Sequence, residues 1–241
     1  MSYMKKIIKT KNRQIIEKTL YYTYSCLPSD KKAIRKRAKR INQTPERQKE
    51  INRLHAANKL ALKIANNFKN ADWYLTLTIA GKVPDKEKVK KSLDSFLANM
   101  RRYYKRQGSS LKYIAALENL KGAGRPHGHM LINALAADDI TAIKKYWPLG
   151  RIRIELFGGN IEDCTKLAAY FKKEDVEEHS GRLRTSTNLI NPIETKEKVT
   201  RSECFSQRIT PPKGYHVNKQ LTYQSYTKDG YPCQRIIFVR D

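Results

Sequence analysis

The sequence predicts an α+β protein whose central domain is a split βαβ antiparallel sheet with helices on one face. Three observations lead to this prediction. Apolar and polar residues alternate as in strands from Trp73 onward, helix-like stretches with an apolar spacing near 3.6 separate these strands, and the order is β-α-β-β-α-β-α. We place this domain at residues 71–180, after a basic, mostly helical region at 1–70 and before a C-terminal extension at 181–241.

The N-terminal region carries over half of the positive charge. Residues 1–70 hold 19 Lys or Arg against 4 Asp or Glu, which is +15 of the formal net charge of +26, and seven of the ten residues at 31–40 are basic. Such an excess indicates a polyanionic partner. A nucleic acid fits better than a membrane, because no lipid-inserting apolar stripe accompanies the basic run. From Pro45 to about Phe68 the apolar spacing predicts a helix, which either binds DNA or packs on the next domain.

The central domain opens with a strand in which Trp73, Leu75 and Leu77 share one face while Thr76 and Thr78 share the other. The later elements are expected, in chain order, as a helix from Pro84 to about Tyr104, strands at 111–118 and 127–135, a helix at 138–146, a strand at 151–157 and a helix at 161–175. An extended polar loop at 181–194 follows, and the chain ends in a hairpin that turns at Asp229-Gly230.

The sequence also excludes several classes of protein. The four cysteines are widely separated and form no CxxC pair, which argues against a zinc ribbon or a disulfide framework. No 18-residue apolar stretch and no apolar signal-peptide core are present, so we expect a reduced, cytoplasmic protein without a membrane partner. No GxxxxGK[ST] loop occurs, which predicts that the chain has no nucleotide-driven motor.

Two histidines in the run GRPHGHMLIN suggest a metal site. His127 and His129 are one residue apart, so on a strand both imidazoles point to the same face. Glu118 ends the preceding strand, and if it pairs with His127 across the turn, its carboxylate joins that face. One carboxylate and two imidazoles leave open positions for water or a phosphate oxygen. The set suits Mn²⁺ or Mg²⁺, with Mn²⁺ tolerating imidazole better, and Zn²⁺ accepts the same ligand types.

The helix at 161–175 supplies a candidate nucleophile. Tyr170 lies at the border of the apolar stripe of this helix, with Lys166 four residues before it and Lys173 three residues after it. A phenol is a poor nucleophile at its reference pKa of about 10. Nearby lysines favour the phenolate, and a metal reduces the charge on an attacked phosphate. Tyr170 is therefore a candidate for covalent phosphoryl chemistry.

Taken in order, three segments resemble the motifs of a known superfamily. The segments YLTLT at 74–78, PHGHMLI at 126–132 and LAAYFKK at 167–173 resemble those of HUH endonucleases, specifically the rolling-circle replication initiators, or Rep proteins. The segment RLRTSTNLINP also resembles the region after the catalytic domain in Rep-like proteins of Firmicutes plasmids, phages and integrative elements. The resemblance covers about residues 74–195. One departure is Gly128, because the residue between the two histidines is usually apolar in the family.

The resemblance implies a site- and strand-specific enzyme that nicks and joins DNA. By position, Glu118, His127 and His129 would hold the divalent metal ion, Mn²⁺ or Mg²⁺, that polarises the scissile phosphate. Tyr170 would attack this phosphate, leaving a 5′-phosphotyrosine link and a free 3′-hydroxyl that primes synthesis. Lys173 would contact the phosphate or stabilise the phenolate.

The resemblance also implies a DNA surface around this site. Thr76 and Thr78 would line its DNA side, and three further basic residues are expected to contact DNA, namely Arg125, Lys166 and Lys172. The expected partner is single-stranded DNA at a replication origin. Because no motor motif is present, a separate host helicase would unwind the duplex and a host polymerase would extend the new end.

Two enzymes with the same chemistry are alternatives. A conjugative relaxase usually has its nucleophile before the histidines, and the YYTY cluster of Tyr21, Tyr22 and Tyr24 would fit that order. Against it, no third histidine lies near the pair, and Tyr170 lies in the better motif. A single-strand transposase shares the order seen here but is commonly shorter and lacks a long basic N-terminal region.

A non-enzymatic binder of RNA or DNA is the alternative from a different class. Such a protein typically stacks bases on exposed aromatic side chains of the sheet face. The first strand presents Thr76 and Thr78 on that face instead, although Tyr74 keeps the option open. Three ordered motifs favour the enzyme.

Overall fold

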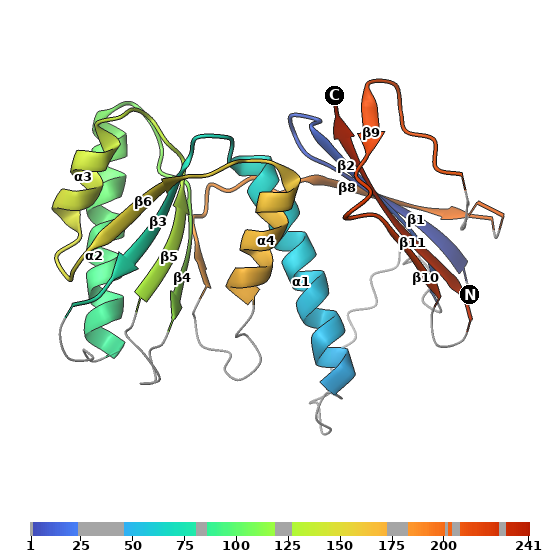
Figure 1. Cartoon of the computed structure of the whole chain (residues 1–241), viewed down its shortest axis with the longest axis horizontal. Coiled ribbons are helices and arrows are strands. Elements are labelled where there is room, and N and C mark those ends of the chain that lie inside the picture. Colours follow the sequence, from blue (N-terminus) through green and yellow to red (C-terminus); the bar gives the residue numbers. More distant parts are fainter. Residues whose placement is uncertain are drawn as a thin grey trace, which may run out of the picture. The chain divides into compact units, whose positions relative to one another are not determined.

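The computed structural model describes residues 2–23, 46–80, 86–118, 127–172, 183–200, 202–203, 208–226 and 230–241. The chain divides into two compact units, each built around its own sheet (Figure 1). Unit 1 combines residues 1–51 with 191–241, and unit 2 is the continuous segment 52–190. The α+β class is confirmed.

Unit 2 contains a five-stranded antiparallel sheet in the order β6-β3-β5-β4-β7. Its strands are β3 (Trp73–Thr78), β4 (Tyr113–Glu118), β5 (His127–Ile132), β6 (Ile152–Leu156) and β7 (Leu183–Thr185). Its helices are α1 (Glu46–Asn67), which begins just before the unit, α2 (Lys86–Arg106), α3 (Asp139–Tyr146) and α4 (Ile161–Lys172). These elements lie within a few residues of the predicted ones, except that the expected polar loop at 181–194 contributes the short edge strand β7.

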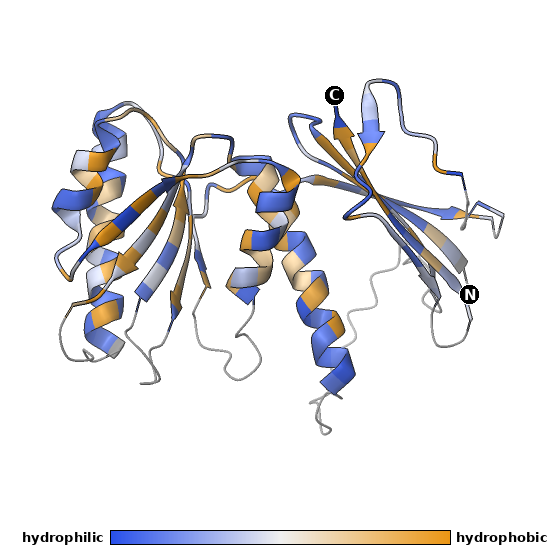
Figure 2. Ribbon diagram, in the orientation of Figure 1, coloured by the Kyte–Doolittle hydropathy of each residue, from blue (hydrophilic) through white to orange (hydrophobic). Residues whose placement is uncertain are grey.

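One face of this sheet packs against α2 and α3. The strands supply alternate residues to this core, and both helices supply their apolar sides; its buried members include Leu75, Leu77, Val89, Phe96, Met100, Leu117, Met130, Ile143 and Trp147. Figure 2 shows the same division, with apolar residues alternating along the strands and gathered along one side of each helix. Burial of these side chains is the main stabilising contribution to the unit.

The prediction that the helices lie on one face is wrong. In Figure 1, α2 and α3 lie on one side of the sheet while α1 and α4 lie on the other. The physical reason is that the central strands are apolar on both faces. All six residues of β4 are buried, and Ile114 and Leu131, which face away from α2, are both 0% exposed. Both faces therefore need cover, and α4 provides part of it with a buried stripe that consists of Ile161, Cys164, Leu167, Ala168 and Phe171.

Asp72 joins four elements of unit 2 at the start of β3. Its carboxylate accepts hydrogen bonds from the backbone N–H of Lys69, just after α1 (2.8 Å), and of Ala134, just after β5 (2.9 Å). Its carbonyl oxygen accepts from the N–H of Phe157, just after β6 (2.7 Å). The residue is 1% exposed, so these bonds satisfy backbone donors that water does not reach.

Unit 1 is a six-stranded antiparallel sheet made from both ends of the chain. The order is β10-β11-β2-β1-β8, with β9 also paired to β11. The strands are β1 (Ser2–Lys9), β2 (Ile15–Thr23), β8 (Ile193–Val199), β9 (Tyr215–Val217), β10 (Tyr223–Tyr226) and β11 (Pro232–Arg240). A buried ion pair crosses from β11 to β2, where the Arg235 guanidinium donates through Nε (2.9 Å) and Nη2 (2.6 Å) to Glu17 Oε2.

The expectation of a mostly helical N-terminal region is wrong for residues 2–23. These residues form the hairpin of β1 and β2, because SYMKKIIK and IIEKTLYYT are rich in residues that favour strands. The basic run at 31–40 lies outside the described residues. The expected terminal hairpin is confirmed, since β10 pairs with β11; Gly230 at its turn has φ +76°, and Asp229 lies outside the described residues. In the part of the chain that the structure describes, no helix is long and apolar enough to cross a membrane.

We expect Asp72→Ala to lower the free energy of unfolding of unit 2 by about 3 kcal/mol, because two buried N–H donors lose their acceptor. Urea unfolding followed by tryptophan fluorescence measures this, since both tryptophans, Trp73 and Trp147, belong to unit 2. The matched control is Asp138→Ala, whose exposed side chain caps no helix N–H and whose loss should change stability little. Equal stability of the two variants would contradict the role assigned to Asp72.

Candidate active site

The pairing of β4 with β5 brings three potential metal ligands together. Glu118 and His127 are directly opposed in this ladder, and His129 follows on the same face, opposite Ala116. The ligand atoms of the three residues all lie within 4.8 Å of one another. The His127 Nε2–Glu118 Oε2 distance is 3.3 Å, and the His129 Nε2–Glu118 Oε2 distance is 3.9 Å. These three residues are the group for which the sequence predicted convergence.

The donor set fits a divalent cation. Two imidazole nitrogens and one carboxylate oxygen are ligands that Mn²⁺ accepts, and three ligands leave positions open for substrate oxygens. Glu118 and His129 are 8% and 9% exposed, whereas His127 is more exposed, so the group lies at the surface on one side only. A bound cation would also compensate the partly buried carboxylate.

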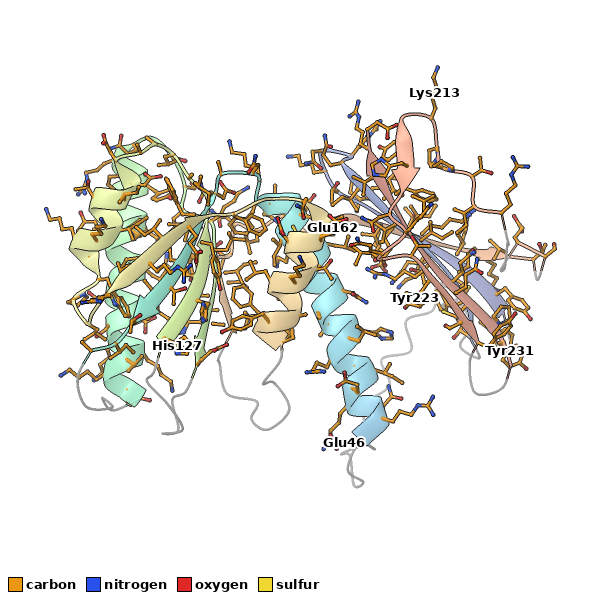
Figure 3. The ribbon with its side chains drawn as sticks, in the orientation of Figure 1. Glu46, His127, Glu162, Lys213, Tyr223 and Tyr231 are labelled. Carbon is orange, nitrogen blue, oxygen red and sulfur yellow. The ribbon has the colours of Figure 1, made fainter. Side chains whose placement is uncertain are left out.

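Tyr170 of α4 reaches this group from the covered side. Its hydroxyl oxygen lies 2.8 Å from Glu118 Oε2, to which the hydroxyl donates, and 2.8 Å from His129 Nε2. Figure 3 labels His127 at the start of β5 and Glu162, in the first turn of α4, toward the opposite end of the sheet, so α4 runs toward the histidines. The buried stripe of α4 fixes the helix, and Tyr170, next to this stripe, is half-buried.

Tyr74 supports the site from β3, and the sequence analysis did not assign it this role. Its hydroxyl lies 2.8 Å from His129 Nδ1, and the two rings stack with a centroid distance of 5.9 Å and an interplanar angle of 12°. Burial, and then the charges of Glu118 and Glu155, raise the pKa of Tyr74 to about 12, so it stays a neutral phenol near neutral pH. Holding Nδ1 orients the ring so that Nε2 faces Glu118 and Tyr170. The signal in the sequence was that Tyr74 alternates onto the same face as Thr76.

The two threonines expected at the site lie on the same sheet face as the histidines. Thr76 opposes His129 and Thr78 opposes His127 in the β3–β5 ladder. Thr76 Oγ1 is 3.4 Å from His129 Nδ1, so Thr76 contacts the site directly, though less closely than Tyr74 does. Both threonines are half-buried.

The basic residues expected to contact DNA are less well placed by the structure. Lys166 is exposed on α4, and within the described residues no hydrogen bond or ion pair joins it to the three potential ligands. Lys172 is half-buried at the end of α4. Arg125 and Lys173 lie outside the described residues. Tyr21 and Tyr22, the alternative nucleophiles, lie on β2 of unit 1, and Tyr24 is not among the described residues.

Gly128 is accounted for by its neighbours on the α2 side of the sheet. A Cβ atom at this position would lie 3.2 Å from Leu117 Cδ2 and 3.7 Å from Leu77 Cβ, which is tighter than ordinary packing for the first contact. These leucines therefore fill the space that an apolar side chain occupies in the family pattern. The glycine does not leave the strand unpacked, and the two histidines keep their common face.

Comparisons with known proteins give one family match. A family of replication-associated proteins of the ORF2 type matches residues 72–175, a span that contains β3 to α4 and all of Glu118, His127, His129 and Tyr170. No relative was found among curated protein sequences. Among solved structures, "Crystal Structure of the hypothetical protein ORF119 from Sulfolobus islandicus rod-shaped virus 1" is similar at a TM-score of 0.36 and 18% identity, covering 50% of this chain and 96% of that chain.

We expect Tyr74→Phe to weaken Mn²⁺ binding by about tenfold or more, because an outer hydrogen bond that orients a metal-binding histidine has an effect of this size. Isothermal titration calorimetry measures the affinity. Tyr113→Phe is the matched control, since it also removes a bonded tyrosine hydroxyl but on the opposite face of the sheet. Equal affinities of Tyr74→Phe and the wild-type protein would mean that His129 is oriented without Tyr74.

Proposed function

We propose that the protein is a metal-dependent endonuclease and strand transferase that acts on single-stranded DNA and initiates replication at an origin. The observation that carries this proposal is the contact of the Tyr170 hydroxyl with Glu118 Oε2 and His129 Nε2, each at 2.8 Å. A candidate nucleophile thus lies at the group of atoms that would hold a cation. These residues are 41 and 52 positions from Tyr170 in the sequence, so only the fold brings them together.

Two further observations support the proposal. The family match spans the four residues and comes from a replication-associated family, which supports a role in replication. The antiparallel order β6-β3-β5-β4, with helices between β3 and β4 and between β5 and β6, supports the split βαβ sheet that the resemblance to HUH endonucleases implies.

In the proposed reaction, the oxygen of Tyr170 attacks the phosphorus of a phosphodiester. The new bond joins Tyr170 Oη to phosphorus, and the bond between phosphorus and the 3′ oxygen breaks, which leaves a 5′-phosphotyrosine and a 3′-hydroxyl. The phenol gives up its proton, for which Glu118 Oε2 is an acceptor at 2.8 Å, and the leaving 3′ oxygen takes up a proton. One phosphodiester replaces another, so no nucleoside triphosphate is consumed and the 3′-hydroxyl can reverse the reaction.

Each of the other residues has a defined part. Glu118, His127 and His129 would hold the cation, which lowers the charge on the attacked phosphate. Tyr74 orients His129, while Thr76 and Thr78 line the face that the strand approaches. Lys166, Lys172, Lys173 and Arg125 would supply positive charge around the path of the DNA.

A non-enzymatic binder is less well supported. That function needs aromatic rings on the sheet face that are free to stack on bases. On this face Tyr74 is half-buried, its ring stacks on His129, and its hydroxyl bonds to that imidazole. The aromatic ring that kept this alternative open is thus engaged in the proposed site.

The first test is a covalent-adduct assay with labelled single-stranded oligonucleotides and Mn²⁺. We expect an adduct that survives denaturing electrophoresis with the wild-type protein and with Tyr146→Phe, a control that removes a hydroxyl bonded to Arg106 elsewhere in unit 2. Tyr170→Phe should give no adduct and bind DNA within about twofold of wild type, because only the reacting oxygen is lost. An adduct in Tyr170→Phe would move the nucleophile to the YYTY cluster at 21–24.

Metal removal is the second test. We expect a chelator to abolish the adduct, and Mn²⁺ to restore it, in the wild-type protein. His127→Ala and His129→Ala should each lower Mn²⁺ affinity by at least about tenfold, because each removes one of three protein ligands. Calorimetry and the adduct assay measure the two effects separately. A chelated protein that still forms the adduct would rule out the metal-dependent mechanism.

A further inference from the structure

A polar cavity lies at the edge of the sheet in unit 2, apart from the proposed active site. It has a volume of about 440 Å³ and forms where the last turns of α2 meet the start of β4 and the turn after β7. This volume lies within the range of sites that hold small ligands. The proposed mechanism makes no use of this cavity.

The cavity is positively charged. Arg101 and Lys105 line it, and no carboxylate does. Among the residues that the structure describes, neither cation forms an ion pair. Two uncompensated positive charges beside a cavity favour an anionic ligand.

Arg101 is held in a fixed position at this cavity. Its Nη2 donates to the Tyr113 hydroxyl (2.9 Å), and its guanidinium carbon lies 5.5 Å from the centroid of the same ring. A guanidinium has five N–H donors, so one bond to Tyr113 leaves others for a ligand. A planar, pre-positioned guanidinium suits the oxygens of a phosphate.

Hydroxyl groups complete the lining. Ser109, Ser110, Thr185 and Thr187 contribute side chains, and Ser186 is 8% exposed. The Ser186 Oγ accepts from the N–H of Tyr113 (3.0 Å), and within the described ranges its own hydroxyl proton has no acceptor. Hydroxyl and guanidinium donors together are the groups that proteins use on nucleic-acid phosphates.

We propose that this cavity binds a backbone phosphate of the same DNA strand that reacts at Tyr170, an inference that rests on the proposed function. Tyr113 and Glu118 are the two ends of β4, so they lie about 17 Å apart at about 3.3 Å per residue. At about 3.4 Å per nucleotide in a helical strand, and about twice that when extended, the bound phosphate is about three to five nucleotides from the scissile one. The strand passes over the edge strand β7 and is fixed at a second point.

The two cations also lie in the last turns of α2, where positive charge offsets the partial negative charge of a helix end. That role concerns stability, whereas phosphate binding concerns DNA affinity. The two are therefore separable by measuring both in the same variants.

The experiment compares Arg101→Gln/Lys105→Gln with Arg102→Gln/Lys144→Gln, a control that removes the same charge from exposed positions on α2 and α3 outside the cavity. Fluorescence anisotropy measures the affinity for a single strand of about twenty nucleotides, a length that covers both points, over a range of salt concentrations. We expect the cavity variant to lose about tenfold in affinity, as for one charge-assisted bond, and its salt slope to fall by about 0.7, as for one phosphate contact. The control should keep the wild-type slope, and Mn²⁺ binding should be unchanged in both.

Each other outcome overturns the inference. Equal affinity and slope in the two double variants would mean that the cavity binds no phosphate of the strand. A loss of thermal stability with unchanged DNA affinity would assign the cations to the helix end. Calorimetry with inorganic phosphate and thymidine monophosphate is the second arm: a small anion that binds only when the cavity is intact, with DNA affinity unaffected, would make the ligand a free phosphate. A wild-type protein that binds the strand but forms no adduct would refute the proposed function while leaving the cavity result interpretable.

Discussion

The alignment of β4 with β5 is the constraint on which the candidate site depends. Side chains alternate between the two faces of a strand, so a shift of one residue in this ladder would move Glu118 out of line with His127 and disturb the ligand geometry. The alignment is held from the other face, where Leu117 and Met130 belong to the core beneath α2. Polar chemistry on one face is therefore positioned by hydrophobic packing on the other.

Covering both faces of the sheet has a second effect on this chemistry. The face that carries the histidines is apolar at its centre, with Ile114 and Leu131 fully buried, and polar toward the end where Glu118 and His127 lie. The apolar part anchors α4, and the polar part receives the one polar side chain that this helix extends toward it, Tyr170. A helix that packs for hydrophobic reasons thus delivers a hydroxyl to a cluster of titratable groups.

Local sequence signals were sufficient for unit 2 and insufficient for unit 1. The spacing of His127 and His129 and the short connection from Glu118 are local features, so their convergence could be predicted from strand geometry alone. The hairpin at 2–23 was missed because a high density of lysine was given more weight than the strand preference of the intervening residues. Its partners, β8 and β11, begin more than 160 residues later, and pairing over such a separation leaves no periodic signal.

Other errors have equally specific causes. Alternation in β3 suggested one polar face, but β4 and β5 are buried on both, which placed a helix where none was expected. The importance of Tyr74 was visible only as membership of a face, because the contact with His129 Nδ1 depends on ring orientation. A hydroxyl that holds a histidine in place has no characteristic spacing in a sequence.

Unit 1 is assembled from the first and last strands of the chain, and unit 2 is one uninterrupted stretch between them. During synthesis, every strand of the sheet in unit 2 leaves the ribosome before β8, so this sheet can form while the outer one is still incomplete. β1 and β2 have to wait for β8 and β11, which cover both edges of their hairpin. Trimming either end of the chain therefore removes strands from the same sheet, so a shortened protein would expose the unpaired edges of that sheet to association with other chains.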